Sequence, residues 1–322
     1  MQAIRVEAHG GPEVLRLAEL PAPEPPAGHV RVRLAAAGLN FIEVYQRTGL
    51  YPVSLPWTPG GEGAGEVVAV GPAVSGLAVG DRIASVNLLG SYAEEALVAA
   101  EKAVVVPRGI ELQDAAAALL QGMTAHYLAF STFPLKPGHS CVVHAAAGGV
   151  GRLLVQLAKR CGARVFATAG SPEKAALARE AGADHVVLYR DQDFLEVVRR
   201  ETGGRGVEVV YDSVGADTWA KSLDCLAPLG MLVLYGQSSG VVPPFSASLL
   251  AQKGSLFLTR PILFHYVGDR ASLERRAADV FRWIADGSLR LRIGARFPLA
   301  EARRAHEALE GRQTTGKVLL VP

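Results

Sequence analysis

Hydrophobic and polar positions alternate with two different periods along the chain. Up to about residue 110, short runs of period two are separated by Gly and Pro, a pattern that predicts strands joined by tight turns. Examples are residues 29–34, 66–70 and 81–86. The Pro-rich stretch 21–26 predicts a surface loop, because strand patterns resume directly on both sides. The first third therefore favours an all-β or barrel-like domain with one or two helices.

The middle third combines short β-branched runs with stretches of helical spacing. An apolar run at 140–144 is followed by residues 150–160, whose apolar side chains fall on one helical face. The series continues with expected strands at 164–168, 185–188, 207–211 and 231–235, and with expected helices at 171–181, 193–202 and from about 217. Repeated β-α units predict a parallel sheet covered by helices on both faces, which is a doubly wound nucleotide-binding layout.

After about residue 260 the pattern becomes helical again. A helix is expected at 272–285, closed by Gly287, and it is followed by a helix at 299–310 and a strand at 317–321. This tail is too short for a third domain. We expect it to return and complete the first domain, which makes that domain discontinuous.

Composition places the chain among ordinary globular proteins. Of the 322 residues, 49% are hydrophobic and 20% are charged, which excludes disorder as the main description. The net charge is +2 and the basic residues are scattered, so no nucleic-acid partner is expected. Three distant cysteines, Cys141, Cys161 and Cys225, form neither a disulfide framework nor a sulfur-rich metal site, which indicates a reducing compartment.

No targeting or membrane segment is evident in the sequence. The first residues, MQAIRVEAHGGPEV, lack the basic start and apolar run of a signal peptide. The longest apolar stretch, 115–130, is interrupted by Gln121 and His126, so it is not expected to span a bilayer. We expect a cytoplasmic protein without a membrane partner.

The most informative segment is the turn HAAAGGVG at residues 144–151, between an expected strand and an amphipathic helix. Gly148 and Gly151 fill the second and third glycine positions of G-x-G-x-x-G, and Ala146 stands at the first. A glycine-rich turn can also serve only to tighten a loop, but the strand before and the helix after it favour dinucleotide binding. We predict that Gly148, Gly149 and Val150 contact the cofactor.

The end of the second strand of this series predicts the choice of cofactor. An NAD-preferring site has an acidic residue there, and this chain has Ala169. Gly170, Ser171 and Lys174 follow, and a hydroxyl and an ammonium at a helix start can hold a 2′-phosphate. Tyr189 ends the third strand and is expected beside the same phosphate or the adenine. NADPH is therefore favoured; the alternative interpretation is that Ser171 is only a helix cap and Lys174 an ordinary solvated side chain.

Several runs of residues resemble the zinc-independent quinone oxidoreductases, including the zeta-crystallin-like enzymes, of the medium-chain dehydrogenase/reductase superfamily. The runs are residues 138–151 (GHSCVVHAAAGGVG) with Gln156 and Lys159, residues 38–52 (GLNFIEVYQRTGLYP), residues 210–215 (VYDSVG) and residues 253–261 (KGSLFLTRP). The similarity covers essentially the whole chain.

This resemblance implies an α/β protein with a GroES-like β-barrel catalytic domain at 1–120 and 260–322 around a Rossmann domain at 121–259. The nicotinamide is then expected in the cleft between the two domains. Members of the family commonly form homodimers through the edge strand of the Rossmann domain, which here would lie around 240–257.

The resemblance also bears on metal binding. Zinc-dependent relatives use an early Cys, a His before a Glu and a later Cys, and the matching positions here are Asn40, Gly61 (before Glu62) and Leu120. None of these supplies the thiolate or imidazole that zinc prefers. No Cys occurs before residue 141, so the structural four-cysteine loop of those relatives is missing as well. We expect no metal.

Without a metal, quinone reduction is the plausible chemistry, because a quinone accepts hydride readily and hydride transfer then depends on positioning and hydrogen-bond donors. By resemblance, Asn40 is expected to bond the nicotinamide ribose or an acceptor oxygen. Tyr45 and Tyr51 each offer a ring to stack on a flat acceptor and a phenol to donate a hydrogen bond to it. The alternative interpretation of each tyrosine is a packed aromatic side chain with a solvated hydroxyl.

Family matching further suggests which residues approach the cofactor. These residues are Thr124, Tyr127, Tyr235, Gly236 and Gln237. Arg260 is expected either to bind an anionic group or to pair with a carboxylate at the domain hinge. The eight histidines, His144 among them, show no ligand spacing and are interpreted as structural or exposed.

Two other functions remain open at this point. A metal-free, NADPH-dependent reductase of conjugated C=C bonds, such as an enoyl or alkenal reductase, would use a tyrosine as proton donor. A non-enzymatic NADPH-binding protein would bind the cofactor without turnover. The activity of this chain toward quinones and conjugated enones distinguishes the three.

Overall fold

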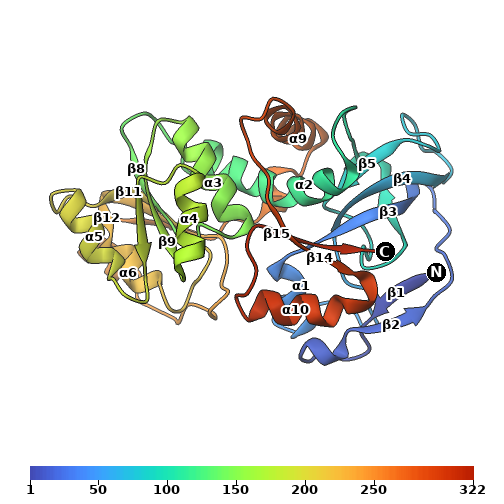
Figure 1. Cartoon of the computed structure of the whole chain (residues 1–322), viewed down its shortest axis with the longest axis horizontal. Coiled ribbons are helices and arrows are strands. Elements are labelled where there is room, and N and C mark those ends of the chain that lie inside the picture. Colours follow the sequence, from blue (N-terminus) through green and yellow to red (C-terminus); the bar gives the residue numbers. More distant parts are fainter. The chain divides into compact units, whose positions relative to one another are not determined.

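The computed structural model describes residues 1–322, which form two compact units. Unit 1 comprises residues 1–123 and 267–322, and unit 2 comprises residues 124–266. The C-terminal tail therefore belongs to the same unit as the N-terminal part of the chain. Figure 1 shows the elements of both units in sequence colours.

Unit 1 is built on a seven-stranded sheet in the order β14-β15-β3-β4-β5-β7, with β6 paired to β3. The strands are β3 (His29–Leu39), β4 (Glu62–Val70), β5 (Arg82–Ser85), β6 (Glu95–Ala99), β7 (Val104–Val105), β14 (Ile293–Pro298) and β15 (Lys317–Val321). A second, two-stranded sheet pairs β1 (Gln2–Arg5) with β2 (Arg16–Glu19). The long β3 pairs with β4 along one edge and, along the other edge, with β6 at its start and β15 at its end.

Four α-helices and three short turns complete unit 1. They are α1 (Phe41–Arg47), α2 (Leu112–Tyr127), α9 (Arg270–Ala285), α10 (Ala302–Glu310), η1 (Pro12–Val14), η2 (Ala100–Lys102) and η4 (Leu299–Glu301). The last residues of α2 belong to unit 2. The two helices expected in the tail are confirmed with shifted starts. The first begins two residues early because Asp269 caps it, accepting a hydrogen bond from the N–H of Ser272 at 2.8 Å.

Small side chains let the helices of unit 1 pack closely. In α10, Ala302 and Ala305 are buried against a cluster that includes Ile4, Leu39 and Val318. None of the helices, α2 included, combines the length and the apolarity needed to cross a bilayer.

Unit 2 is a six-stranded parallel sheet in the order β10-β9-β8-β11-β12-β13. Its strands are β8 (Ser140–Val143), β9 (Arg164–Ala169), β10 (His185–Leu188), β11 (Val207–Asp212), β12 (Leu226–Leu234) and β13 (Phe257–Thr259). Counted within the unit, the order is 3-2-1-4-5-6, which is that of the Rossmann fold. The predicted doubly wound sheet is confirmed.

Helices cover both faces of this sheet (Figure 1). The helices of unit 2 are α3 (Gly149–Arg160), α4 (Pro172–Glu180), α5 (Phe194–Glu201), α6 (Trp219–Asp224), α7 (Ser248–Gln252) and α8 (Leu263–Tyr266), with a π-helical turn η3 (Leu128–Thr132) before β8. The green α3 and α4 lie on one face and the yellow α5 and α6 on the other. Phe194, Val198 and Leu223 of α5 and α6 form the core with Val142 and Val210 of the central strands.

Candidate functional site

The carboxyl ends of the parallel strands in unit 2 carry most of the predicted cofactor residues. The strand order reverses at β8, which has β9 on one side and β11 on the other, so the loops after β8 and β11 lead to opposite faces. Ligands of such sheets bind outside the carboxyl ends of the strands at this point. The predicted residues that follow these strands are Gly148, Gly149, Val150, Gly170, Ser171, Lys174, Tyr189, Tyr235, Gly236 and Gln237.

The glycine-rich turn after β8 is a close-packed cradle. Gly148 is the N-cap of α3, and its N–H donates to the carbonyl of Ala145 at 2.9 Å. A Cβ at Gly151 would collide with the carbonyl of Ala145, so only glycine lets the turn lie this close to the helix. The first N–H groups of a helix have no partner within it and face outward at the positive end of its dipole. The turn therefore fits a pyrophosphate group.

The residues predicted to select NADPH are brought together at the ends of β9 and β10. Gly170 follows β9, and a Cβ there would lie 2.7 Å from the hydroxyl of Tyr189, so the tyrosine packs directly over the glycine. Ser171 caps α4, and its Oγ accepts the N–H of Lys174 at 3.3 Å. The predicted cap is thus confirmed, and it leaves Ser171 and Lys174 on the same first turn.

Glu173 adds a negative charge next to the predicted 2′-phosphate site, and it was not among the residues predicted for that site. It lies between Ser171 and Lys174 in the first turn of α4. A hydrogen bond from the Ser171 hydroxyl lowers the pKa of this exposed carboxyl. An ionised carboxylate beside the expected 2′-phosphate opposes binding, so Lys174 has to outweigh it. The signal was present in the sequence as the adjacent pair Glu173-Lys174.

The loop after β12 is held close to the loop after β11. The N–H of Tyr235 donates to the carbonyl of Asp212 at 2.9 Å, and a Cβ at Gly236 would lie 2.6 Å from the carbonyl of Ser213. Desolvation raises the pKa of the Tyr235 phenol, which keeps it protonated and a donor. Gln237 is held by Arg260, whose guanidinium reaches its Oε1 at 3.3 Å.

Arg260 follows β13 at the sheet edge. Besides Gln237, it donates to the carbonyl of Leu234 at 2.8 Å. These bonds tie the last two strand ends together.

Thr124 and Tyr127 are buried side chains near the end of α2. The ring of Tyr127 stacks on Tyr266, with centroids 4.1 Å apart and planes 9° from parallel. Their predicted approach to the cofactor stays a prediction.

In unit 1, Asn40 lies at the junction of β3 and α1, where it caps the helix. Its N–H donates to Glu43 at 2.8 Å, and the two residues form a capping box. The Nδ2 group donates to the carbonyl of Gly38 at 3.2 Å and to Glu62 at 2.9 Å. The Oδ1 atom accepts from Lys317 at 2.7 Å.

The amide of Asn40 is thus engaged on both of its atoms. Gln121 adds a further donor to Oδ1 at 3.4 Å. A ligand oxygen that accepted a hydrogen bond from Nδ2 would have to displace the carbonyl of Gly38 or the carboxylate of Glu62. The predicted hydrogen bond from Asn40 to a ligand stays a prediction.

The three positions compared with zinc ligands meet at one buried carboxylate. Glu62 accepts from Asn40 and from the N–H of Leu120, the latter at 2.7 Å. The ammonium of Lys317 forms an ion pair with the same carboxylate. A Cβ on Gly38 would collide with this pair, which explains the glycine there. No group of three or more His, Cys, Asp or Glu side chains in the chain is placed to hold a metal ion.

Tyr45 and Tyr51 lie side by side. Their rings meet edge to face with centroids 5.3 Å apart, and the N–H of Tyr51 donates to the carbonyl of Tyr45 at 2.9 Å. Tyr45 is buried on α1, whereas Tyr51 is partly exposed in the loop beyond it. Tyr51 is therefore the more exposed of the two residues.

Several buried polar residues in these units were not predicted from the sequence to take part in a site. Lys317 stands at the head of the apolar run KVLLV, and a single charge there was the available signal. His144 was interpreted as structural or exposed, and Asp212 lay inside a run quoted for the resemblance without a role being assigned. Both are fully buried, with hydrogen-bond partners that come from other elements.

Comparisons with known proteins agree with this description. Residues 26–131 match the family described as alcohol dehydrogenase GroES-like domain, and residues 149–262 match the family described as zinc-binding dehydrogenase. A quinone oxidoreductase of Pseudomonas aeruginosa is 47% identical, over 99% of this chain and 99% of its own. A 2-haloacrylate reductase of a Burkholderia species is 42% identical, over 100% of this chain and 99% of its own. The crystal structure of the Escherichia coli quinone oxidoreductase complexed with NADPH is 43% identical, with a TM-score of 0.98 over 100% of both chains.

Proposed function

Because this chain belongs to the quinone oxidoreductase family of the medium-chain dehydrogenase/reductase superfamily, we propose that it transfers hydride from NADPH to quinones without a metal. The observation that carries the proposal is the glycine-rich turn at the carboxyl ends of a Rossmann sheet. The metal-free chemistry is supported by the donor set, since Asn40, Gly61 and Leu120 offer neither thiolate nor imidazole where zinc-dependent relatives have ligands.

We assign the binding of NADPH to unit 2, with Asn40 of unit 1 as the one residue from outside it. The N–H groups of Gly149 and Val150 and the dipole of α3 would hold the pyrophosphate. Lys174 would hold the 2′-phosphate as a point charge, and Tyr189 would cover the adenine side. The remaining residues assigned to the cofactor are Asn40, Thr124, Tyr127, Gly148, Gly170, Ser171, Tyr235, Gly236 and Gln237. When bound, NADPH supplies the hydride.

We assign the handling of the acceptor to residues of unit 1. Hydride addition to a quinone leaves negative charge on its oxygen, and a hydrogen bond to that oxygen lowers the barrier. Tyr51 is the proposed donor, because it is more exposed than Tyr45. Tyr45 would support the ring of Tyr51, and Asn40 would line the site.

Reduction of a conjugated C=C bond is the second candidate. It is favoured by the 42% identity to a 2-haloacrylate reductase over the full chain. The same hydride donor serves both reactions, but here a carbon must receive the proton. Tyr51 would then act as an acid rather than only as a hydrogen-bond donor.

We also propose a homodimer. The edge strand β13 pairs only with β12, and the segment 241–264 that contains it exposes large apolar side chains. These are Val241, Phe245, Phe257, Ile262 and Phe264. A second copy of the chain pairing along this edge would cover them. In sedimentation, Phe257→Lys should shift a dimer toward monomer, and an unchanged dimer would contradict this surface.

The proposed compartment is the cytoplasm. Its support is the three free cysteines, of which Cys141 and Cys225 are buried. No nucleic-acid or membrane partner is proposed, because the basic residues form no stripe in the sequence.

The deciding experiment measures initial rates of NADPH oxidation in buffer that contains a chelator. An ortho-quinone, a conjugated enone and a blank are compared, and each is repeated with NADH. Fast, chelator-insensitive quinone reduction that prefers NADPH supports the proposal. Reduction of the enone without reduction of the quinone would establish the second candidate function, reduction of a conjugated C=C bond. Binding of NADPH without reduction of either acceptor would favour a non-enzymatic binding protein.

A further inference from the structure

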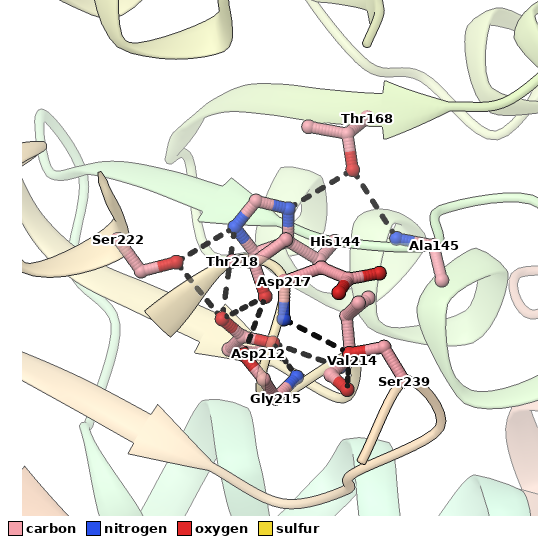
Figure 2. A network of polar contacts seen from close by, with 10 residues as sticks. All are labelled: His144, Ala145, Thr168, Asp212, Val214, Gly215, Asp217, Thr218, Ser222 and Ser239. Carbon is pink, nitrogen blue, oxygen red and sulfur yellow. Dashed lines mark hydrogen bonds and ion pairs between the residues drawn. The ribbon is translucent and has the colours of Figure 1, made fainter. Parts of the chain in front are cut away.

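Asp212 is a fully buried carboxylate at the carboxyl end of β11, and it accepts four hydrogen bonds (Figure 2). Its Oδ1 accepts the N–H groups of Val214 at 2.8 Å and Gly215 at 3.0 Å. Its Oδ2 accepts the hydroxyls of Thr218 at 2.7 Å and Ser222 at 2.8 Å. These four hydrogen bonds fix the position and orientation of the carboxylate of Asp212.

The bond from Ser222 sets the direction of the next one. The hydroxyl of Ser222 has one hydrogen, and it donates that hydrogen to Asp212 in a hydrogen bond. The Oγ atom therefore accepts a hydrogen bond from the Nε2 of His144, 3.0 Å away. The ring of His144 is fully buried, and burial lowers its pKa more than Asp212 raises it. The imidazole is therefore neutral, with its one proton on Nε2, and its Nδ1 accepts the hydroxyl of Thr168 at 3.0 Å.

Thr168 ends this series of bonds at the glycine-rich turn. The hydroxyl of Thr168 donates its hydrogen bond to His144, so its Oγ1 accepts the N–H of Ala145 at 3.3 Å. The carbonyl of Thr168 accepts the N–H of Ala146 at 3.1 Å. Ala145 has a φ of +49°, a conformation that few residues with a Cβ adopt. Two bonds from one threonine thus hold the strained start of the turn.

The other side of Asp212 reaches a third loop. The carbonyl of Val214 accepts the hydroxyl of Ser239 at 2.7 Å and its N–H at 2.8 Å. The hydroxyl of Ser239 in turn accepts the N–H of Asp217 at 3.0 Å. Ser239 belongs to the loop after β12 that carries residues 235–237, and Figure 2 shows it beside the turn held by Asp212.

We infer that Asp212 and His144 are positioning residues that hold the loops after β8, β11 and β12 in one arrangement through a directed series of hydrogen bonds. The series runs from the Ala145 N–H through Thr168, His144 and Ser222 to the carboxylate. Each group donates toward Asp212, so the bonds polarise one another in the same sense. The inference rests on the proposed binding of NADPH to these loops, and it assigns no contact between these side chains and the cofactor.

Isosteric removal of one hydroxyl tests the role in binding. Thr168→Val should raise the Kd for NADPH by about tenfold, while kcat at saturating NADPH changes by less than about twofold. Thr168→Ser keeps the hydroxyl and should stay close to the parent protein. Thr202→Val is the matched control, because Thr202 in the same unit also accepts one N–H, from Gly206, and donates to one carbonyl, that of Val198.

An unchanged Kd in Thr168→Val, with NADPH still bound by the parent protein, would overturn the inference and leave the proposed function standing. Absence of NADPH binding by the parent protein would overturn both. An equal rise in Kd for Thr202→Val would show a general effect of losing a hydroxyl and would also overturn the inference.

The protonation of His144 gives a test that does not depend on NADPH. Nitrogen-15 NMR of the imidazole in the parent protein should show a proton on Nε2 and none on Nδ1. A proton on Nδ1 would reverse the bond to Thr168 and overturn the directed series. His144→Gln supplies the assignment of the signal.

Discussion

The ammonium of Lys317 donates to the side-chain oxygen of Asn40 across 2.7 Å, although 277 positions separate them in the sequence. Lys317 begins β15, and the antiparallel pairing of β15 with β3 brings it to the end of β3, which Asn40 follows. The same ammonium pairs with the buried carboxylate of Glu62. One cation thus orients both a proposed site residue and the acid beside it.

Removing this cation should be costly to the fold. Lys317→Met leaves Glu62 buried without its charge partner, and we expect the free energy of unfolding to fall by about 3 to 5 kcal/mol. The double variant Lys317→Met with Glu62→Gln should recover a large part of this loss, because no uncompensated charge remains. Urea unfolding of the two single variants and the double variant measures the coupling, and strictly additive losses would contradict it.

Glu43 should make stability depend on pH. Burial raises the pKa of its carboxyl from 4.5 to about 7, against the lowering effect of Lys317 and of the bond from Asn40. The folded protein then keeps a proton that the unfolded chain releases. Its contribution to stability is present below about pH 4.5 and is lost as the pH rises through 7.

Glu43→Gln is neutral at every pH and can still accept the bond from Asn40. Its free energy of unfolding, relative to the parent protein, should rise between pH 4.5 and 7 by on the order of 3 kcal/mol. Denaturant unfolding across this pH range measures the difference. If the difference in free energy of unfolding between Glu43→Gln and the parent protein does not vary with pH, the raised pKa of Glu43 is contradicted.

Tyr51→Phe should lower quinone turnover with little change in the affinity for NADPH. The substitution keeps the ring that packs on Tyr45 and removes only the proposed donor. One lost donor to a developing oxyanion corresponds to a decrease in kcat of roughly tenfold to a hundredfold. Tyr45→Phe is the matched control, and equal losses in both variants would return Tyr51 to a packing role.

Charges in the first turn of α4 should control the preference for NADPH. Lys174→Ala is expected to weaken NADPH much more than NADH, because only NADPH carries the 2′-phosphate. Glu173→Gln should act in the opposite sense and tighten NADPH by a few-fold, since it removes a neighbouring negative charge. Titration of each variant with NADPH and with NADH measures the two affinities. Equal changes in the affinity for NADH and for NADPH would contradict the placement of the 2′-phosphate beside the first turn of α4.

Two glutamates on α10 should differ sharply in their effect on stability. Arg47 is fully buried and pairs with Glu310 at 2.7 Å, while its Nε and Nη1 have no hydrogen-bond partner. Glu310→Ala should therefore cost about 3 kcal/mol. Glu307→Ala breaks only the exposed pair with Arg303 and should cost less than about 0.5 kcal/mol. Thermal or urea unfolding compares them, and similar losses would contradict the difference.

Local signals in the sequence were sufficient for the Rossmann unit. The cap Ser171, the first-turn Pro172 and the stop at Gly182 act within one helix, and the structure has α4 between them. The glycine-rich turn is likewise decided by neighbours, because Gly151 must clear the carbonyl of Ala145 only six positions earlier. The helix α1 was expected only as one of one or two helices, since its seven residues are too few for a clear period.

The sequence by itself therefore determined the turn and the cofactor class from short segments, the parallel sheet from its repeated β-α units, and the family from resemblance along the whole chain. Only the tertiary structure decided which buried polar groups meet. Lys317 reaches Asn40 through strand pairing, and Asp212 reaches Ala145 through three side chains from three elements. A hydrogen bond depends on distance and direction between groups far apart in the chain, and no local pattern of residues contains that information.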